Sequence, residues 1–177
     1  ETGVNVLTHL IDNVLTFQST DVGNFQINKT ITNLTKLCSN TIEEIKLLDK
    51  ENHIFEFNYA KAELILSLDV RITRQILTHI LINAIKFSPG ETQVKLNLIE
   101  REDSVLIELI DQGVGMTQEE LQTIFNSFQR RDKDIGLIPG IGLGLAIVRR
   151  YIEALSWNIN FQSEVNRGTK VIIVIPK

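Results

Sequence analysis

Residues 77–88 read Leu77-Thr-His-Ile-Leu-Ile-Asn-Ala-Ile-Lys-Phe-Ser88, a dense apolar pattern with a few polar residues set into it. Upstream, Asp69 is a residue type that caps helix starts, and the run Ser88-Pro89-Gly90 cannot continue a helix. We therefore predict one long helix from Asp69 to Phe87. The apolar face of this helix must pack against another layer of the fold.

Three polar side chains of this helix point to a ligand site. Asn83 and Lys86 are three residues apart and His79 lies one turn before Asn83, so the three share a face. A buried amide that lacks a hydrogen bond costs about 1–3 kcal/mol. Asn83 therefore either bonds to nearby backbone or acts as an oxygen ligand for Mg²⁺, which takes few protein ligands beside phosphate and water. The helix pattern alone leaves both interpretations open.

Two glycine clusters follow the ends of predicted elements. The first reads Asp111-Gln-Gly-Val-Gly115, and the second reads Gly140-Ile-Gly-Leu-Gly-Leu145 and opens a helix. Free backbone N–H groups at a helix start favour a phosphate. A Walker loop is excluded, because no Lys-Ser or Lys-Thr pair follows either cluster. A dinucleotide fingerprint is disfavoured, because the second cluster follows a charged loop and not a strand. A glycine string alone is also consistent with a plain turn.

The other segments predict strands and helices without the alternation of a parallel α/β fold. Thr92–Glu100 and Ser104–Ile110 alternate apolar and polar residues and predict a hairpin. The other predicted strands are Phe25–Thr32, His53–Tyr59, Leu64–Leu68, Asn158–Ser163 and Thr169–Ile175, and the other predicted helices are Asn33–Leu48, Thr117–Ile124 (with a capping box to Glu120) and Leu143–Leu155. This order favours an α+β fold, a two-layer sandwich with helices on one face of a mixed sheet. His53, beside charged residues, is predicted to lie at the surface.

Composition excludes several classes of protein. The chain has 177 residues, 43% of them hydrophobic, a net charge of −4 and one cysteine, Cys38. This length suits one domain with a short appended segment. A net negative chain offers no basic field, so no nucleic-acid partner is expected. No apolar run approaches the roughly 20 residues that span a bilayer, and we expect this domain to be cytoplasmic, whether or not a longer protein carrying it is membrane-anchored.

The first 22 residues are predicted to form a separate unit. Val4, Leu7, Ile11 and Val14 step by three, four and three residues, the spacing of a coiled-coil seam. So short a helix is marginal alone and needs a partner, either another chain or its own domain. A polar stretch ends at Gly23, so we place 1–22 as a helix tail with its linker and 23–177 as the main domain.

Five segments, in order, resemble the sequence boxes of the ATP-binding domain of sensor histidine kinases, in the GHKL superfamily. Residues 77–88 are similar to the N box, 111–115 to G1, 124–130 to the F box, 140–145 to G2 and 168–169 to G3. The resemblance covers about residues 23–177 and implies a Bergerat-type fold with ATP and Mg²⁺ as cofactors. It implies a two-component kinase domain that transfers the ATP γ-phosphate to a histidine on a hairpin outside this chain.

The resemblance also implies roles for single residues. Asp111 would accept a hydrogen bond from the adenine amino group, and Asn83 would bind Mg²⁺. Lys86 and Arg130 would contact the phosphates, so the catalytic residues would be Asn83, Lys86 and Arg130. Arg131 and Lys133, which follow in the lid, are the alternatives to Arg130. Simple packing remains open for Phe87, and a solvated position for Lys86. The full nucleotide-binding set that the resemblance implies is His79, Asn83, Lys86, Phe87, Asp111, Gly113, Gly115, Arg130, Gly140, Gly142, Leu143, Gly144, Leu145 and Thr169.

The sequence departs from the family pattern at His79. These kinases often have an asparagine there, and GHKL ATPases such as gyrase and MutL have a glutamate that activates water. Since an imidazole is a poor substitute for that carboxylate, strong intrinsic ATP hydrolysis is not expected. The F box also reads Phe-Asn-Ser-Phe-Gln-Arg where Phe-Glu-Pro-Phe-Tyr-Arg is commoner, a difference that concerns the packing of the lid.

The resemblance implies several partners. They are the phosphoacceptor hairpin of the same protein, a response regulator, and a second copy bound through the N-terminal helix, which is similar to the end of the hairpin's second helix. His9 is not expected to be the phosphoacceptor, because Leu10-Ile11 follows it in place of an acidic residue. The alternative function is a nucleotide-binding regulatory module, either a pseudokinase or an anti-sigma-type serine kinase. A GHKL ATPase machine is disfavoured by His79.

Overall fold

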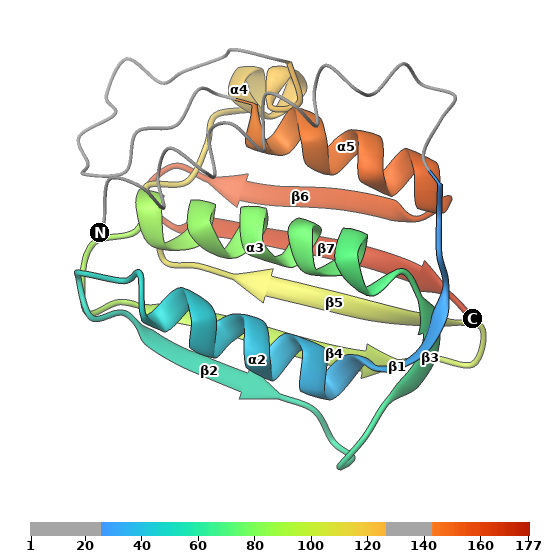
Figure 1. Cartoon of the computed structure of the whole chain (residues 1–177). Coiled ribbons are helices and arrows are strands. Elements are labelled where there is room, and N and C mark those ends of the chain that lie inside the picture. The colour runs from blue at the N-terminus through green and yellow to red at the C-terminus, as the bar shows by residue number, and fades with distance from the viewer. Residues whose placement is uncertain (1–25, 127–142) are drawn as a thin grey trace.

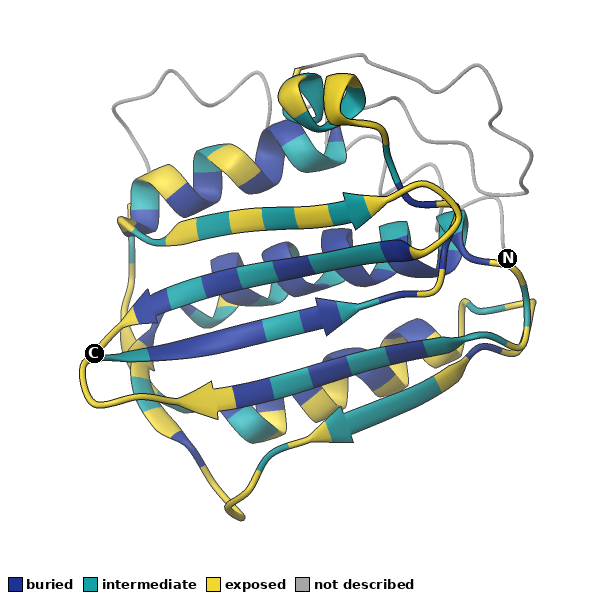
Figure 2. Cartoon of the chain, turned by 180° about the vertical axis from the view of Figure 1, so that it is seen from behind, coloured by how far each residue is buried: buried dark blue, intermediate teal, exposed yellow. Residues whose placement is uncertain are grey.

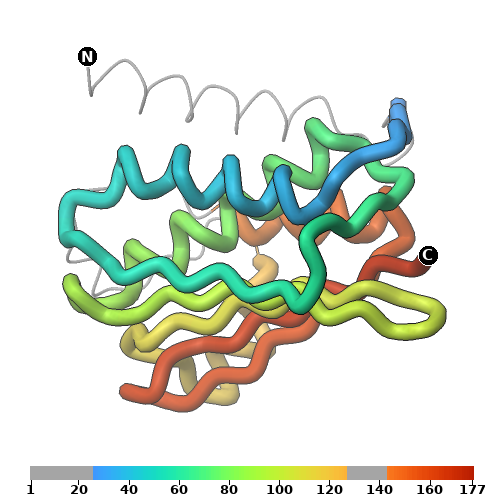
Figure 3. Tube along the Cα trace, turned by 90° about the horizontal axis from the view of Figure 1, so that it is seen from below, coloured from blue at the N-terminus to red at the C-terminus, as the bar shows by residue number. Residues whose placement is uncertain are grey.

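The computed structural model describes residues 26–126 and 143–177. One sheet has the strand order β2-β4-β5-β7-β6, and helices α2, α3 and α5 cover one of its faces (Figures 1 and 3). β2 runs parallel to β4 and the other neighbours are antiparallel, so the sheet is mixed. The predicted α+β two-layer sandwich is confirmed. The strands of this sheet are β2 (Ile54–Asn58), β4 (Gln93–Glu100), β5 (Ser104–Ile110), β6 (Asn158–Glu164) and β7 (Gly168–Pro176), and the helices are α2 (Leu34–Lys46), α3 (Val70–Phe87), α4 (Gln118–Thr123) and α5 (Gly144–Leu155).

A separate two-stranded ribbon crosses one end of the sandwich. It pairs β1 (Thr30–Asn33) with β3 (Ile65–Leu68) in antiparallel register. The predicted strand Phe25–Thr32 is therefore wrong in its extent, because residues 26–29 form no strand and β1 ends one residue later than expected. The cause is tertiary: β3 offers only four residues for pairing, and their register sets both ends of β1.

Side-chain caps begin the helices where the sequence predicts them. Asn33 accepts from the backbone N–H of Lys36 at 3.0 Å, and Asp69 accepts from the backbone N–H of Ile72 at 2.9 Å. Thr117 and Glu120 form a reciprocal capping box at the start of α4. Each cap satisfies N–H groups that have no partner inside the helix, worth about 1 kcal/mol. The main helix thus begins after Asp69, as predicted.

The core lies between the helices and the sheet. α3 packs between α2 and α5, and alternate residues of β5 and β7 point toward these helices. Figure 2 shows the opposite face of the sheet, where buried and more exposed residues alternate along the central strands. Burial of each large aliphatic side chain contributes about 1.5–3 kcal/mol. The least exposed of these side chains are Leu34, Ile45, Ile72, Ile76, Leu77, Leu81, Leu96, Ile107, Leu109, Ile147, Ile173 and Ile175.

The predicted surface position of His53 is wrong. Its side chain is 1% exposed, and its Nδ1 lies 2.8 Å from Oδ1 of Asp49, whose side chain is 5% exposed. Its Nε2 lies 3.3 Å from the backbone carbonyl oxygen of Ser88, which caps the end of α3. The charged neighbours of His53 in the sequence suggested a surface position. In the fold the Asp49 carboxylate gives the buried imidazole a polar partner. The pair fastens the α2–β2 connection to the end of α3.

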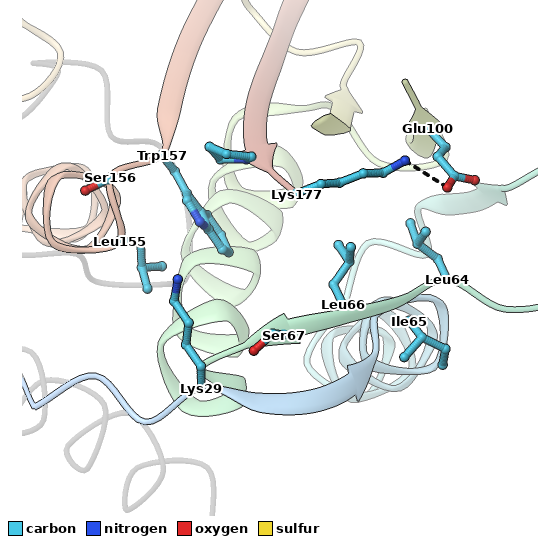
Figure 4. Close-up of a pocket in the computed structure, with 11 residues that line it drawn as sticks. Lys29, Leu64, Ile65, Leu66, Ser67, Glu100, Leu155, Ser156, Trp157 and Lys177 are labelled. Atoms are coloured by element: carbon cyan, nitrogen blue, oxygen red, sulfur yellow. Dashed lines mark hydrogen bonds and ion pairs between the residues drawn. The ribbon is translucent and has the colours of Figure 1, made fainter. Parts of the chain in front are cut away.

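A groove of about 660 Å³ lies at the β1–β3 end of the molecule (Figure 4). It is bordered by β3, by the α5–β6 connection with Trp157, and by Lys177 at the end of β7. Lys61 and Lys177 both bond to Glu100, and these contacts lower the pKa of Glu100 to about 2. The groove is distant from the residues singled out by the sequence, which gather where β5 ends and β7 begins.

Two further properties of the described ranges are relevant to function. Burial raises the pKa of the Cys38 thiol to about 12, so this cysteine is not a reactive thiolate at neutral pH. Across residues 26–126 and 143–177, none of the helices combines the length and apolar character needed to cross a membrane.

Candidate functional site

Four chain segments meet at the end of the sandwich opposite the groove. They are the end of α3, the end of β5, the start of β7 and the start of α5 (Figure 1). The turn after Asp111, the end of the long helix and the start of α5, which are far apart in the sequence, converge here. A shallow cleft of about 330 Å³ opens beside Asp111 and Thr169.

Asp111 is the central polar group of this site. It follows the last residue of β5 and is 8% exposed. Its Oδ1 accepts two backbone hydrogen bonds, from Gly113 at 2.8 Å and from Thr169 at 3.1 Å. Within the described part of the chain, Oδ2 has no hydrogen-bond partner. Burial raises the pKa of the carboxyl group, while the two backbone bonds oppose that shift.

The turn after Asp111 is fastened to the end of α3. The backbone N–H of Val114 donates to the carbonyl oxygen of Phe87 at 3.0 Å. At Gly113 an added Cβ would lie 2.6 Å from the same oxygen, closer than any side chain allows. Only a glycine permits this approach, which places Phe87 and Asp111 side by side.

Gly115 holds the other side of this turn. Its φ is +63°, and an added Cβ would lie 1.8 Å from the carbonyl oxygen of Glu164 at the end of β6. The backbone N–H of Asn166 donates to the carbonyl oxygen of Val114 at 2.8 Å. The turn is therefore clamped between α3 and the β6–β7 hairpin, as a rigid support for Asp111.

The polar face of α3 borders the same end. His79 is buried, whereas Asn83, Lys86 and Phe87 are half-buried. A Cβ at Gly144, the first residue of α5, would lie 3.4 Å from Nδ1 of His79, so α5 begins directly against this ring. The Lys86 ammonium lies 4.9 Å from the centre of the Phe87 ring, a cation–π contact. Leu143, the residue before α5, is buried and makes no side-chain capping bond, and Leu145 is half-buried.

Thr169 has a neighbour that the sequence analysis missed. Oγ of Ser163 lies 2.9 Å from Oγ1 of Thr169 and donates to the carbonyl oxygen of Gly168, also at 2.9 Å. Ser163 and Thr169 face each other in the register of the β6–β7 hairpin. The predicted turn between these strands could have located the pair, because residues equally spaced about a tight turn are cross-strand neighbours.

Part of the predicted site lies outside the described residues. Arg130, Gly140 and Gly142 fall there, as does the end of the segment similar to the F box. The described start of that segment packs against the sheet, since the Phe125 ring meets the Phe161 ring edge to face at 5.4 Å. The structure thus brings together Asp111, Gly113, Phe87 and Thr169 by direct contacts, and Gly115 lies in the same turn. His79 and Gly144 lie against each other.

Residues 68–177 match the family described as histidine kinase-, DNA gyrase B- and HSP90-like ATPases. This match covers more than half of the chain, and the chain belongs to that family.

The proteins that this chain resembles include sensor proteins and sensor histidine kinases. Sensor protein KdpD of Clostridium acetobutylicum is 29% identical over 172 residues, which are 97% of this chain and 19% of the relative. Sensor histidine kinase WalK of Bacillus subtilis is 27% identical over 96% of this chain and 28% of its own length. The chain therefore spans only between 19% and 28% of the length of these curated relatives.

Solved structures share the fold. The full-length ShkA structure in complex with AMPPNP has a TM-score of 0.83 at 23% identity, covering 96% of this chain and 35% of that one. The catalytic domain of histidine kinase ThkA has a TM-score of 0.73 at 24% identity, covering 85% of this chain and 96% of that one. The α+β sandwich is thus the fold of histidine kinase catalytic domains.

Proposed function

We propose that this chain is the ATP-binding catalytic domain of a two-component sensor histidine kinase. The observation that carries the proposal is the Asp111 carboxylate: Oδ1 is occupied by two backbone N–H groups, and Oδ2 is left as an acceptor beside the cleft. An acceptor-only group suits the exocyclic amino group of adenine and repels the carbonyl oxygen of guanine. The AMPPNP in the ShkA structure supports an adenine nucleotide as the ligand of this fold.

The α3 and α5 ends would bind the phosphates. Lys86 supplies a cation at the last turn of α3, and the start of α5 directs free backbone N–H groups toward the same end. The amide oxygen of Asn83, half-buried on α3, suits Mg²⁺, which takes one or two protein oxygens and completes its shell with phosphate and water. Arg130, outside the described residues, is proposed as the further phosphate-contacting cation.

The phosphoacceptor is proposed to lie elsewhere. Phosphoryl transfer depends mainly on positioning and charge stabilisation, so the domain can hold and polarise ATP while another domain supplies the histidine. His79 is buried against α5 and lacks the carboxylate that activates water in related ATPases, so slow hydrolysis is expected. The proposed partners are a phosphoacceptor hairpin, a response regulator and a second copy joined through residues 1–22. We also propose that this domain lies in the cytoplasm.

Labelled ATP tests this proposal. The chain is incubated with γ-labelled ATP and Mg²⁺, alone and with a separately purified phosphoacceptor hairpin, and labelled protein is treated with acid and with base. We expect ATP binding, very slow hydrolysis, no label on this chain, and acid-labile label on the hairpin. Acid-labile label on the chain alone that is lost in His9→Gln would contradict the placement of the acceptor. Label on a serine, stable to acid, would instead support the anti-sigma-type alternative.

A further inference from the structure

The Ser163–Thr169 pair fixes the direction of a hydrogen-bond chain at the cleft. Oγ of Ser163 is 2.9 Å from the carbonyl oxygen of Gly168, and a carbonyl only accepts, so the Ser163 hydroxyl hydrogen is directed to that oxygen. A hydroxyl has a single hydrogen. In the 2.9 Å contact between the two hydroxyl groups, Thr169 must therefore donate and Ser163 accept.

This direction determines what Thr169 can offer to a ligand. Because its hydrogen is used on Ser163, Oγ1 presents lone pairs only. Asp111 Oδ2 is likewise an acceptor, and Asp111, Ser163 and Thr169 all line the cleft of about 330 Å³. The backbone N–H of Thr169 is also occupied, since it donates to Oδ1 of Asp111 at 3.1 Å. The polar side-chain groups of Asp111 and Thr169 are thus acceptors without a free donor.

We infer that Ser163 is a positioning residue for base selection: it holds the Thr169 hydroxyl as an acceptor and so denies a donor to a 6-oxo purine. The inference rests on the proposed binding of adenine nucleotide. With Ser163 present, an adenine amino group meets acceptors at the Asp111 and Thr169 side chains, whereas the O6 atom of hypoxanthine or guanine meets no donor from either of these two side chains. Without the Ser163 hydroxyl, the Thr169 hydroxyl is free to rotate and can donate to O6.

Ser163 can be substituted without disturbing the backbone around the cleft. The residue is half-buried on β6, and among the described residues its hydroxyl group makes the two hydrogen bonds given above. Removal of its Oγ leaves the backbone pairing of β6 with β7 intact. The backbone bond from Thr169 to Asp111 Oδ1 is also unaffected, so the Asp111 carboxylate keeps its orientation.

The experiment compares the affinities of ATP and ITP, which differ in the base edge, for the whole 177-residue chain by calorimetry. In Ser163→Ala we expect the ITP-to-ATP ratio of dissociation constants to fall by about three- to tenfold, the worth of one neutral hydrogen bond. Ser163→Thr, which keeps a hydroxyl, should restore the wild-type ratio. Thr169→Val should weaken ATP without strengthening ITP, because it has no hydroxyl to donate. Ser104→Ala, at the opposite end of the sheet, is the matched control.

Each outcome decides between the claims. An unchanged ratio in Ser163→Ala, or an equal loss of affinity for both nucleotides, overturns the positioning role while the proposed function stands. Failure of the wild type to bind ATP overturns the proposed function and the positioning role with it. Should Ser163→Ala not fold, as judged by its circular dichroism, the ITP affinity of Thr169→Val decides: an unchanged ITP affinity supports the hydrogen-bond direction, and a gain in ITP affinity contradicts it.

Discussion

Replacement of Asp111 by asparagine should separate binding from stability. Two backbone N–H groups, from Gly113 and Thr169, point at one oxygen of the side chain at 2.8 and 3.1 Å. They force an asparagine to place its oxygen there, because the reverse orientation would set an NH₂ group against two donors. The amide NH₂ of Asp111→Asn must then face the cleft, where the carboxylate offered an acceptor.

The magnitudes follow from these contacts. A hydrogen bond to a charged group contributes about 1.5–3 kcal/mol, so ATP affinity should fall about ten- to hundredfold. Stability should change in the opposite direction. Burial raises the pKa of Asp111, so the folded chain binds the proton more tightly than the unfolded chain does. That contribution to stability is present at low pH and is lost as the pH rises through the folded pKa. At neutral pH the carboxylate therefore costs stability, and the neutral amide removes the cost.

The assay has two parts. A fluorescent ATP analogue is titrated into the wild type, Asp111→Asn and the control Asp103→Asn, and the ligand-free proteins are unfolded by heat at pH 8. We expect weaker ATP binding and a higher melting temperature only in Asp111→Asn. Equal ATP affinities of wild type and Asp111→Asn would refute the assignment of the cleft. A lower melting temperature would refute the account of the buried charge.

Three other predictions test the support around the site. Asn83→Ala should abolish the Mg²⁺ dependence of nucleotide binding while the domain stays folded; unfolding without a specific metal effect would favour a structural hydrogen bond. Gly115→Ala should lower the free energy of unfolding in urea by at least about 1–3 kcal/mol, because φ is +63° and the Cβ would lie 1.8 Å from the Glu164 carbonyl oxygen. Gly144→Ala, with its Cβ 3.4 Å from His79, is the control and should fold normally. Burial alone would raise the pKa of Asp49, but hydrogen bonds from His53 and Glu51 lower it below its ordinary 3.8. Asp49→Asn should therefore cost about 1.5–3 kcal/mol at neutral pH, a difference that shrinks as the pH falls through the folded pKa; a pH-independent difference in urea titrations would count against it.

Much of the site could be predicted from the sequence because its motifs are local. The spacing of His79, Asn83 and Lys86 on one helix depends only on helical geometry, and the turn residues Gly113 and Gly115 are two positions apart. In the structure Gly113 lies against the end of the helix that carries these three side chains. Their roles toward nucleotide and metal remain predictions, and so do those of Arg130, Gly140 and Gly142.

The contacts that shape the site are long-range and were not predictable. Asp111 and the Thr169 backbone N–H that it accepts from are 58 residues apart in the chain. The Ser163–Thr169 direction depends on a third group, the Gly168 carbonyl oxygen, whose orientation follows from the turn. His53 was misplaced because its burial depends on Asp49 and on the distant Ser88 carbonyl oxygen.

The sequence by itself determined where helices begin and which strands form hairpins. The caps at Asn33, Asp69 and Thr117 bond to backbone within three residues, and a hairpin needs only alternation about a turn. The tertiary structure alone decided the short β1–β3 ribbon, the burial of His53 and the acceptor character of the Asp111 and Thr169 side chains. The physical reason is the separation of the interacting residues along the chain. A cap or a turn forms its hydrogen bond between residues that are near each other in the sequence. The pairing of remote groups instead depends on how whole elements pack, which no local pattern encodes.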